Sequence, residues 1–472
     1  MVISISENVN AAAEDKGLVL KRFVLSFIVS LPFFTHGIAS TNLSTSDHSG
    51  HFTTPYNVPW TSFALILSSI LSASLQGYFI DKWGRKFGIY LVILLQGASC
   101  IPLFLTHTEV GFIVLHVLSG ISTAGLFLSI PIYIREINSN VHRGVMTSFI
   151  IFMTSAGYLV KFGLTGENIL YLIAALVIVQ FISLFMVVES PSYLVKVGKI
   201  EIAKSNMGKL KCLPVNDPHI EHEIKLLEEE SKRAKPNGEF RFFDIVRNVL
   251  WRDEIKIGLM LSTINTLCGW IIFLDQDKTL IQLKTDVDPQ NFLVPVCMFV
   301  GACVCFLSIR IVERKYLLTF AYSVMVLSMG TLAVFTQADL TVPSYTWLPV
   351  TALSILIFGY GIAWGLPTVI MVEILNLEVR STILSVIFTY SQVLRLAHVM
   401  TFQYIEEYVG IYTLLYIFAC INMFGAVYTI SNVPDIKDSE DDDMPLSTDA
   451  RDVDYRSKLD SNLSTPEVSG YS

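Results

Sequence analysis

The sequence is poor in charge. Asp, Glu, Lys and Arg make up 16% of its 472 residues, whereas a soluble globular chain carries about 25% charged residues. Hydrophobic residues make up 52%, so most of this chain is expected to meet lipid rather than water. The net charge of −8 reflects an acidic stretch after Asp435, and no basic cluster typical of nucleic-acid binding is present.

Signatures of nucleotide binding, metal binding and acid–base catalysis are also missing. No Gly-x-x-x-x-Gly-Lys-Ser/Thr pattern occurs, which argues against coupling to ATP through the common phosphate-binding loop. The long apolar segments have no Asp or Glu at their centres, so a proton-coupling carboxylate is disfavoured. Without paired carboxylates or a metal cluster, the chain is not predicted to be an enzyme and no cofactor is expected.

Twelve apolar segments dominate the chain, each about 20 residues long, as a helix needs to cross a hydrocarbon core of about 30 Å. Of the 33 Lys and Arg residues, only Lys161, Lys278, Lys284 and Arg395 fall outside the N-terminus, the even-numbered loops and the C-terminal tail. Since basic residues favour cytoplasmic loops, both termini are predicted to be cytoplasmic. The segments cover residues 18–40, 60–80, 87–105, 111–134, 145–165, 169–188, 255–274, 291–309, 316–335, 347–372, 382–402 and 408–433.

A charged stretch between the sixth and seventh segments divides the chain. We predict an all-α membrane protein with a cytoplasmic N-terminus (1–17), an N-terminal six-helix bundle (18–188), a cytoplasmic linker (189–254), a C-terminal six-helix bundle (255–433) and an acidic tail (434–472). The tail has the composition of a disordered segment. Within the linker, residues 219–235 place Ile220, Ile224 and Leu227 on one face and predict a surface helix.

The two halves share a signature that indicates duplication. Glu136 and Arg143 follow the fourth segment, and Glu373 and Arg380 follow the tenth, with the same spacing of seven. After the second segment comes the loop Gly77-Tyr-Phe-Ile-Asp81-Lys-Trp-Gly84-Arg85-Lys86, and after the eighth comes the weaker Val312-Glu313-Arg314-Lys315. Parallel repeats around a site at the midplane are known from membrane transporters.

These motifs resemble those of a known family. The loop from Gly77 to Lys86 resembles that of the major facilitator superfamily. Two further motifs are similar to those of its sugar porter family: Pro131-Ile-Tyr133-Ile-Arg-Glu136 with Arg143-Gly144, and Glu189-Ser190-Pro191-Ser-Tyr193-Leu194. The resemblance extends over residues 18–434, the whole membrane body, and is strongest to insect facilitated trehalose and glucose transporters. It implies two bundles that rock around a midplane site, which opens to one side at a time.

Charged residues at the segment ends predict a cytoplasmic gate. Gly84 permits a tight turn, and Asp81 beside Arg85 can form a charge-assisted bond. A network of such pairs, each worth about 0–1 kcal/mol when exposed, can hold the halves together and still open. Ordinary helix-end charges are the alternative interpretation. The predicted gate residues are Asp81, Arg85, Glu136, Arg143, Glu189, Glu373 and Arg380.

The cavity motifs depart from the family pattern. Asn265-Thr266 replaces the Gln-Gln pair of the seventh span, and Ile151 replaces the Gln of the fifth. The tenth span lacks its usual Trp after Pro367, although Trp364 lies one turn earlier. These losses matter because an unpaired buried hydroxyl costs about 1–3 kcal/mol. The hypothesised substrate-binding residues are Asn265, Thr266, Trp364 and Gln392.

Two ionisable residues of the eleventh span share one helical face. Arg395 and His398 lie three residues apart, with Gln392 a turn earlier. Such groups are costly inside a membrane and usually face the bundle interior. Both a role in the cavity and structural pairing with neighbouring helices stay open.

We therefore predict a facilitative carrier of a sugar, trehalose or a hexose, or of a similar small polar solute. Its partners would be that solute and the lipid bilayer, not nucleic acid; the oligomeric state is open, and a monomer is compatible with the sequence. The alternative is a transport-inactive receptor or scaffold, which the altered cavity favours and the gate pairs Asp81–Arg85 and Glu136–Arg143 disfavour. The sequon at Asn42 in the first outward loop and the family resemblance favour a glycosylated plasma-membrane protein.

Overall fold

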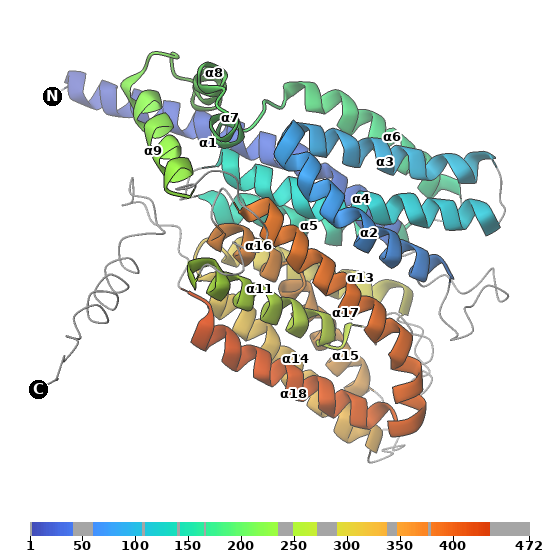
Figure 1. Cartoon of the computed structure of the whole chain (residues 1–472). Helices are drawn as coiled ribbons and strands as arrows, with labels where there is room; N and C mark the ends of the chain where they lie inside the picture. Colours follow the sequence, from blue (N-terminus) through green and yellow to red (C-terminus); the bar gives the residue numbers. More distant parts are fainter. Residues whose placement is uncertain are drawn as a thin grey trace, which may run out of the picture.

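The structure, a computed structural model, describes residues 2–40, 60–105, 109–138, 142–164, 167–234, 249–270, 290–337, 347–375 and 379–434. The regular elements in these ranges are all helices, arranged as two bundles that lie side by side (Figure 1). The predicted glycosylation site Asn42 and the acidic tail from Asp435 onward lie outside the described residues.

The first bundle follows from the first group of apolar segments. Packing pairs within it include α1 with α5, α2 with α4, and α3 with both α4 and α6. Its helices are α1 (Val2–Ser40), α2 (Trp60–Trp83), α3 (Arg85–Leu105), α4 (Glu109–Ile137), α5 (Arg143–Phe162) and α6 (Glu167–Ser183).

The second bundle repeats this plan. Here α13 packs on α15, and α14 packs on α15 and α18. Its helices are α11 (Val249–Leu267), α13 (Gln290–Ser308), α14 (Arg314–Gln337), α15 (Trp347–Ala363), α16 (Leu366–Ile374), α17 (Arg380–Val409) and α18 (Ile411–Asn432). The predicted span 347–372 corresponds to the apolar stretch Trp347–Ile374, within which the helix is interrupted at Trp364 and Gly365. Pro367 lies in the first turn of α16, where its missing N–H has no cost.

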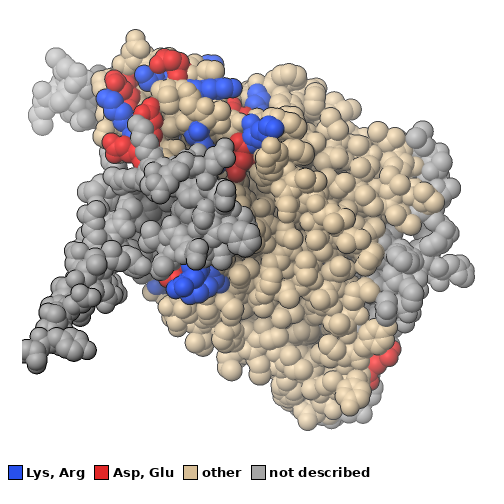
Figure 2. Space-filling view, in the orientation of Figure 1, with Lys and Arg blue, Asp and Glu red and all other residues tan. Residues whose placement is uncertain are grey.

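Helices occupy the predicted membrane segments. Within the described ranges, nine helical stretches are long and apolar enough to cross a membrane, and Leu293–Ser308 of α13 is a shorter apolar helix. Helix α3 occupies the predicted segment 87–105, and α11 occupies the predicted segment 255–274 as far as Leu267. Figure 2 shows most of the charged side chains in view gathered at one end of the molecule, with a broad uncharged surface beside them. The protein is therefore an all-helical membrane protein.

Glycines allow close helix crossings in both bundles. A Cβ on Gly157 of α5 would clash with the backbone carbonyl of Phe34 in α1, and a Cβ on Gly301 of α13 would clash with that of Phe358 in α15. Small residues allow the backbones of membrane helices to approach this closely.

Three short helices cover one end of the first bundle, which we call the linker end (Figure 1). They are α7 (Pro191–Lys196), α8 (Ile200–Lys211) and α9 (Pro218–Ala234). The predicted surface helix is confirmed as α9, with Ile220 and Ile224 buried against α7 and α8. Lys21 Nζ donates a hydrogen bond of 2.6 Å to the Lys209 carbonyl, which joins α8 to α1.

The two bundles meet along two pairs of helices. Helix α2 packs on α17, and α5 packs on α13. At the first contact, a Cβ on Gly77 would lie 3.0 Å from the Ser385 side chain. The predicted gate residues lie where these helices reach the linker end.

Candidate functional site

A tight turn between α2 and α3 begins a network of charged residues at the linker end. Gly84 has φ +107°, and a Cβ there would clash with the Glu189 carboxylate. The turn brings the Arg85 guanidinium back onto its own bundle, where Nη1 lies 3.3 Å from Asp81 Oδ1. Lys196 of α7 lies 3.2 Å from the same oxygen. The glycine therefore allows both the turn and the approach of the linker.

Glu136 connects the two bundles. Arg85 Nε lies 3.1 Å from Glu136 Oε2, and Arg380 Nη1 from the second bundle lies 3.4 Å from Oε1. Ser190 donates a hydrogen bond of 2.5 Å to the same carboxylate. All three ionised side chains are buried, with exposures of 0% for Arg85 and Arg380 and 1% for Glu136. Charges this deeply buried need paired partners, so Glu136 ties the halves together.

The second bundle has a corresponding pair. Arg314, which begins α14 as Arg85 begins α3, lies 3.2 Å from the Glu373 carboxylate. Arg135 of the first bundle donates to the Glu373 carbonyl at 3.2 Å, and the Ser381 hydroxyl donates to Asp81 across the interface. A Cβ on Gly144 would clash with the Arg314 guanidinium. Polar contacts thus cross between the bundles at several points.

The ion pairs among the predicted gate residues differ from those that the sequence spacing indicated. Glu136 contacts Arg85 and Arg380, and Glu373 contacts Arg314, although the sequence grouped each Glu with the Arg seven residues later. Arg143 begins α5. Arg314 was not among the predicted gate residues. The sequence did contain a signal for Arg314, because the weaker loop motif of the second half places this residue where Arg85 stands in the first half.

Glu189 caps a helix. Its Oε1 accepts hydrogen bonds from the backbone N–H groups of Arg85 at 3.0 Å, Lys86 at 3.2 Å and Ser190 at 3.0 Å. The first two belong to the opening turn of α3, where N–H groups lack partners within the helix. Burial raises the pKa of Glu189 above its ordinary value, while these N–H groups and the charge of Arg85 oppose the rise.

We predict that Glu189→Ala lowers the free energy of unfolding by about 1–3 kcal/mol, because it leaves buried N–H groups unpaired. Glu189→Gln keeps an acceptor oxygen and should cost less. Because its pKa is raised, Glu189 contributes stability below its unfolded-state pKa of about 4.3 and loses it as pH rises through the folded-state value. The Gln variant should lack this dependence. Thermal unfolding of the detergent-solubilised variants across pH measures both effects, and equal losses in the two would contradict the capping role.

A second group of residues lies where the two bundles meet. Arg395 Cζ of α17 lies 4.3 Å from the centre of the Trp270 ring, and Trp270 Nε1 donates to the Thr266 carbonyl at 2.8 Å. The neighbouring Asn265 donates to the Trp364 carbonyl at 3.2 Å. Together with two residues of the first bundle, Phe127 and His36, these residues form a group that we call the interface ring. Its members are Arg395, Trp270, Thr266, Asn265, Trp364, Phe127 and His36.

The first bundle completes the interface ring. The Trp364 ring lies 6.4 Å from that of Phe127 in α4, and Phe127 lies 5.9 Å from His36 in α1. His36 in turn lies within electrostatic range of Arg395. The hypothesised residues Asn265, Thr266 and Trp364 therefore come together in the ring. Gln392 is buried on α17, one turn before Arg395, and is not one of its members.

The interface ring presents polar atoms without partners. Asn265 Oδ1, Trp364 Nε1 and Arg395 Nε are buried and have no hydrogen-bond partner among the described residues. The same three residues are only half-buried as a whole. Unpaired polar atoms in such a place are suited to a polar solute, since an unpaired buried group costs about 1–3 kcal/mol.

His398 and Ile151 have structural roles beside the ring. His398 Nδ1 lies 3.1 Å from the Thr266 carbonyl, and its ring packs against Trp270, so it is held by α11. Ile151 is fully buried, and a Cβ on Gly365 would clash with its side chain. The residue that stands in place of the family's Gln therefore packs against the break between α15 and α16.

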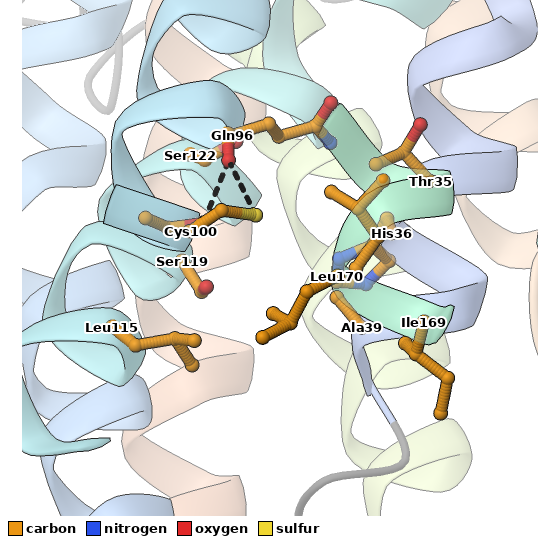
Figure 3. Close-up of a pocket in the computed structure, with 12 residues that line it drawn as sticks. Thr35, His36, Ala39, Gln96, Cys100, Leu115, Ser119, Ser122, Ile169 and Leu170 are labelled. Carbon is orange, nitrogen blue, oxygen red and sulfur yellow. Dashed lines mark hydrogen bonds between the residues drawn. The ribbon is translucent and has the colours of Figure 1, made fainter. Parts of the chain in front are cut away.

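A small cavity lies beside the ring, inside the first bundle. It has a volume of about 40 Å³ and is lined by His36 from α1, Gln96 and Cys100 from α3, Ser119 from α4 and Leu170 from α6 (Figure 3). This is room for a few water molecules and far below the roughly 300–1,000 Å³ of small-molecule pockets. It is not the site of a sugar-sized solute.

The family follows from the sequence match. Residues 23–445 match the family described as sugar (and other) transporter. The chain belongs to this family, and it is a transporter rather than an enzyme.

Named relatives are distant. The facilitated trehalose transporter Tret1 of Bombyx mori is 23% identical over 432 residues, which cover 87% of this chain and 83% of that protein. Tret1 of Apis mellifera ligustica is 23% identical over 392 residues, or 80% of this chain and 77% of that protein. Tret1 of Drosophila willistoni is 24% identical, and this chain spans 45% of its length.

Solved structures show the major facilitator fold. The proton:xylose symporter XylE bound to 6-bromo-6-deoxy-D-glucose superposes with a TM-score of 0.71 and 17% identity, covering 90% of this chain and 98% of that chain. The inward-open conformation of XylE from E. coli gives a TM-score of 0.61 at 18% identity, covering 88% and 97%.

Proposed function

We propose that this protein is a facilitative carrier of a sugar, trehalose or a hexose, or of a similar small polar solute, working by alternating access. Twelve spans would cross the plasma membrane, with both termini and the linker end in the cytoplasm. The described state would be the one closed to the cytoplasm. Movement down the solute gradient would need no cofactor and no proton.

One observation carries the proposal: the buried ion pair between Glu136 and Arg380 joins the two bundles at the linker end of their interface. Arg85, Arg314 and Glu373 extend this network, and the interface ring lies further along the same interface. A carrier needs such a gate, because solute must reach the site from one side at a time. A scaffold has no comparable need for charges that hold two halves reversibly.

The interface ring would bind the solute. Asn265 Oδ1 can accept a hydrogen bond from a hydroxyl, and Trp364 Nε1 can donate one. The ring of Trp364, which makes an edge-to-face contact with Phe127, would supply apolar surface against which a sugar ring can pack. Gln392 and Thr266 remain part of the proposed site, Thr266 through the carbonyl that orients Trp270 and His398.

We predict that purified full-length protein in proteoliposomes takes up labelled trehalose or glucose saturably, with or without a proton gradient. Asn265→Ala and Trp364→Ala should each raise the half-saturation concentration about tenfold, since each removes a buried hydrogen-bond partner. Thr351→Ala, an exposed hydroxyl on α15, is the matched control and should leave uptake unchanged. If Asn265→Ala and Gln392→Ala both have normal kinetics, the site assignment is wrong.

The transport-inactive scaffold is the second candidate. The observation that favours it is the Ile151 side chain packed against Gly365, where the family's pattern has a Gln. Folded protein that takes up none of the solutes tested would favour this candidate.

A further inference from the structure

Arg395 places a positive charge far from either end of its helix. It lies fifteen residues after Arg380 in α17, which is about 22 Å along the helix axis. Its side chain is half-buried and its Nε is buried without a partner among the described residues. A charged side chain at this depth is costly unless another group compensates it.

The described groups that face Arg395 do not include an acid. Trp270 presents the face of its ring to Arg395. Three other residues lie within electrostatic range of Arg395: Tyr360 of α15, His36 of α1 and His398 of α17. The acidic residues nearest in the described part of α17 are Glu406 and Glu407, more than about 15 Å further along the helix. Aromatic and imidazole groups only partly compensate a guanidinium, so an anionic group would complete the compensation of the Arg395 charge.

We propose that the transported solute carries an anionic group, a carboxylate or a phosphate, which binds the Arg395 guanidinium while its hydroxyls bind Asn265 and Trp364. This rests on the proposed carrier function and names the class of solute for the same site. A guanidinium presents parallel N–H donors that match the two oxygens of such a group. The polyhydroxylated part of the solute is recognised by the unpaired atoms of Asn265 and Trp364.

Transport of such a solute moves charge. Each cycle carries the negative charge of the solute, while Arg395 returns with the empty carrier. An inside-positive potential of about 60 mV should therefore raise the accumulation ratio of a monovalent anion about tenfold. A neutral sugar should not respond.

The first test needs no variant. Purified full-length protein is incubated with glucuronate, with its neutral amide glucuronamide, with glucose and with glucose 6-phosphate, and binding is measured by microscale thermophoresis. We expect glucuronate to bind at least about tenfold more tightly than glucuronamide, which has the same shape without the charge. Glucose 6-phosphate in the same assay decides whether the anion is a carboxylate or a phosphate.

Substitutions of Arg395 test whether this residue binds the anionic group. Arg395→Gln should remove the preference for glucuronate over glucuronamide, and Arg395→Lys should retain part of it. Lys161→Gln is the matched control, because Lys161 is a half-buried cation of α5 outside the ring. Monodisperse elution in size-exclusion chromatography shows that each variant is folded.

The outcomes separate this inference from the function on which it rests. Uptake of glucose or trehalose with equal binding of glucuronate and glucuronamide would overturn the anionic solute and leave the carrier standing. A preference for glucuronate that survives in Arg395→Gln would overturn the role of Arg395. No binding or uptake of any of these solutes by folded protein would overturn the carrier function itself.

Discussion

Glu136→Ala is expected to open the cytoplasmic side and stop most uptake. Its carboxylate serves two buried guanidinium groups, one in each bundle. Removing one partner of a buried ion pair costs about 3–5 kcal/mol. Since Arg380 reaches across the interface, this cost falls on the closed state. The ratio of closed to open molecules should fall about 100-fold or more, and a carrier held open to the cytoplasm cannot reload from outside.

A cysteine at Ser385 can report the opening. Ser385 is buried on α17 where α2 packs against it at Gly77. In a Cys212→Ser background, which removes an exposed native thiol, Ser385→Cys should react with a membrane-impermeant maleimide from the cytoplasmic side at least about tenfold faster when Glu136 is Ala. Glu221→Ala removes an exposed carboxylate from α9 and is the matched control. Unchanged labelling in the Glu136 variant would contradict the gate.

Gly157→Leu is expected to prevent stable folding. Its side chain would have to occupy the position of the Phe34 carbonyl, so α1 and α5 would have to separate along their whole crossing. Overpacking of a close contact costs about 1–3 kcal/mol, and more where backbone must move. The yield of monodisperse protein and its Tm measure the effect.

Gly330→Leu provides the control for this prediction. Gly330 is also helical, in α14, but a Cβ there would meet no atom within 4 Å. This substitution should leave yield and Tm close to the wild type. Equal losses in the two variants would mean that leucine is poorly tolerated at helical glycines in general, and not that the crossing at Gly157 is close.

Positions of the helices could be predicted because hydropathy is a local property. A run of apolar residues long enough to span lipid forms a helix wherever its neighbours lie, and the face of Ile220 and Ile224 was readable from spacing alone. The break at Trp364 and Gly365 could not be predicted from hydropathy, because the apolar run continues through it. Pro367 in the first turn of α16 and the packing of Ile151 from the other bundle against Gly365 both accompany the break.

The partners within the site depended on tertiary structure. Sequence spacing grouped Glu136 with Arg143, whereas the docking of the bundles brings Arg380 to Glu136. Asn265 and Trp364 could be proposed because the family pattern pointed to their positions. Phe127 carried no comparable signal, since an aromatic residue in a helix more often packs in a core than contributes to a binding site. His36 could be singled out as an ionisable residue near the outer end of the first span, where an interfacial position and a role in the cavity were both open.

The ion pair between the bundles joins two side chains that are each already held by their own bundle. Arg380 donates to the Leu375 carbonyl through Nε at 3.1 Å and Nη2 at 3.0 Å, and Glu136 is held by Arg85 and Ser190. When the halves part, these local bonds can persist. An arginine side chain loses about 2 kcal/mol of rotamer entropy when it becomes ordered. Because Arg380 is held by its own bundle, this entropy is lost on folding and not at each closure. Each closure then brings together two ordered surfaces, so the rate of reclosing is set by the motion of the bundles rather than by a search among rotamers.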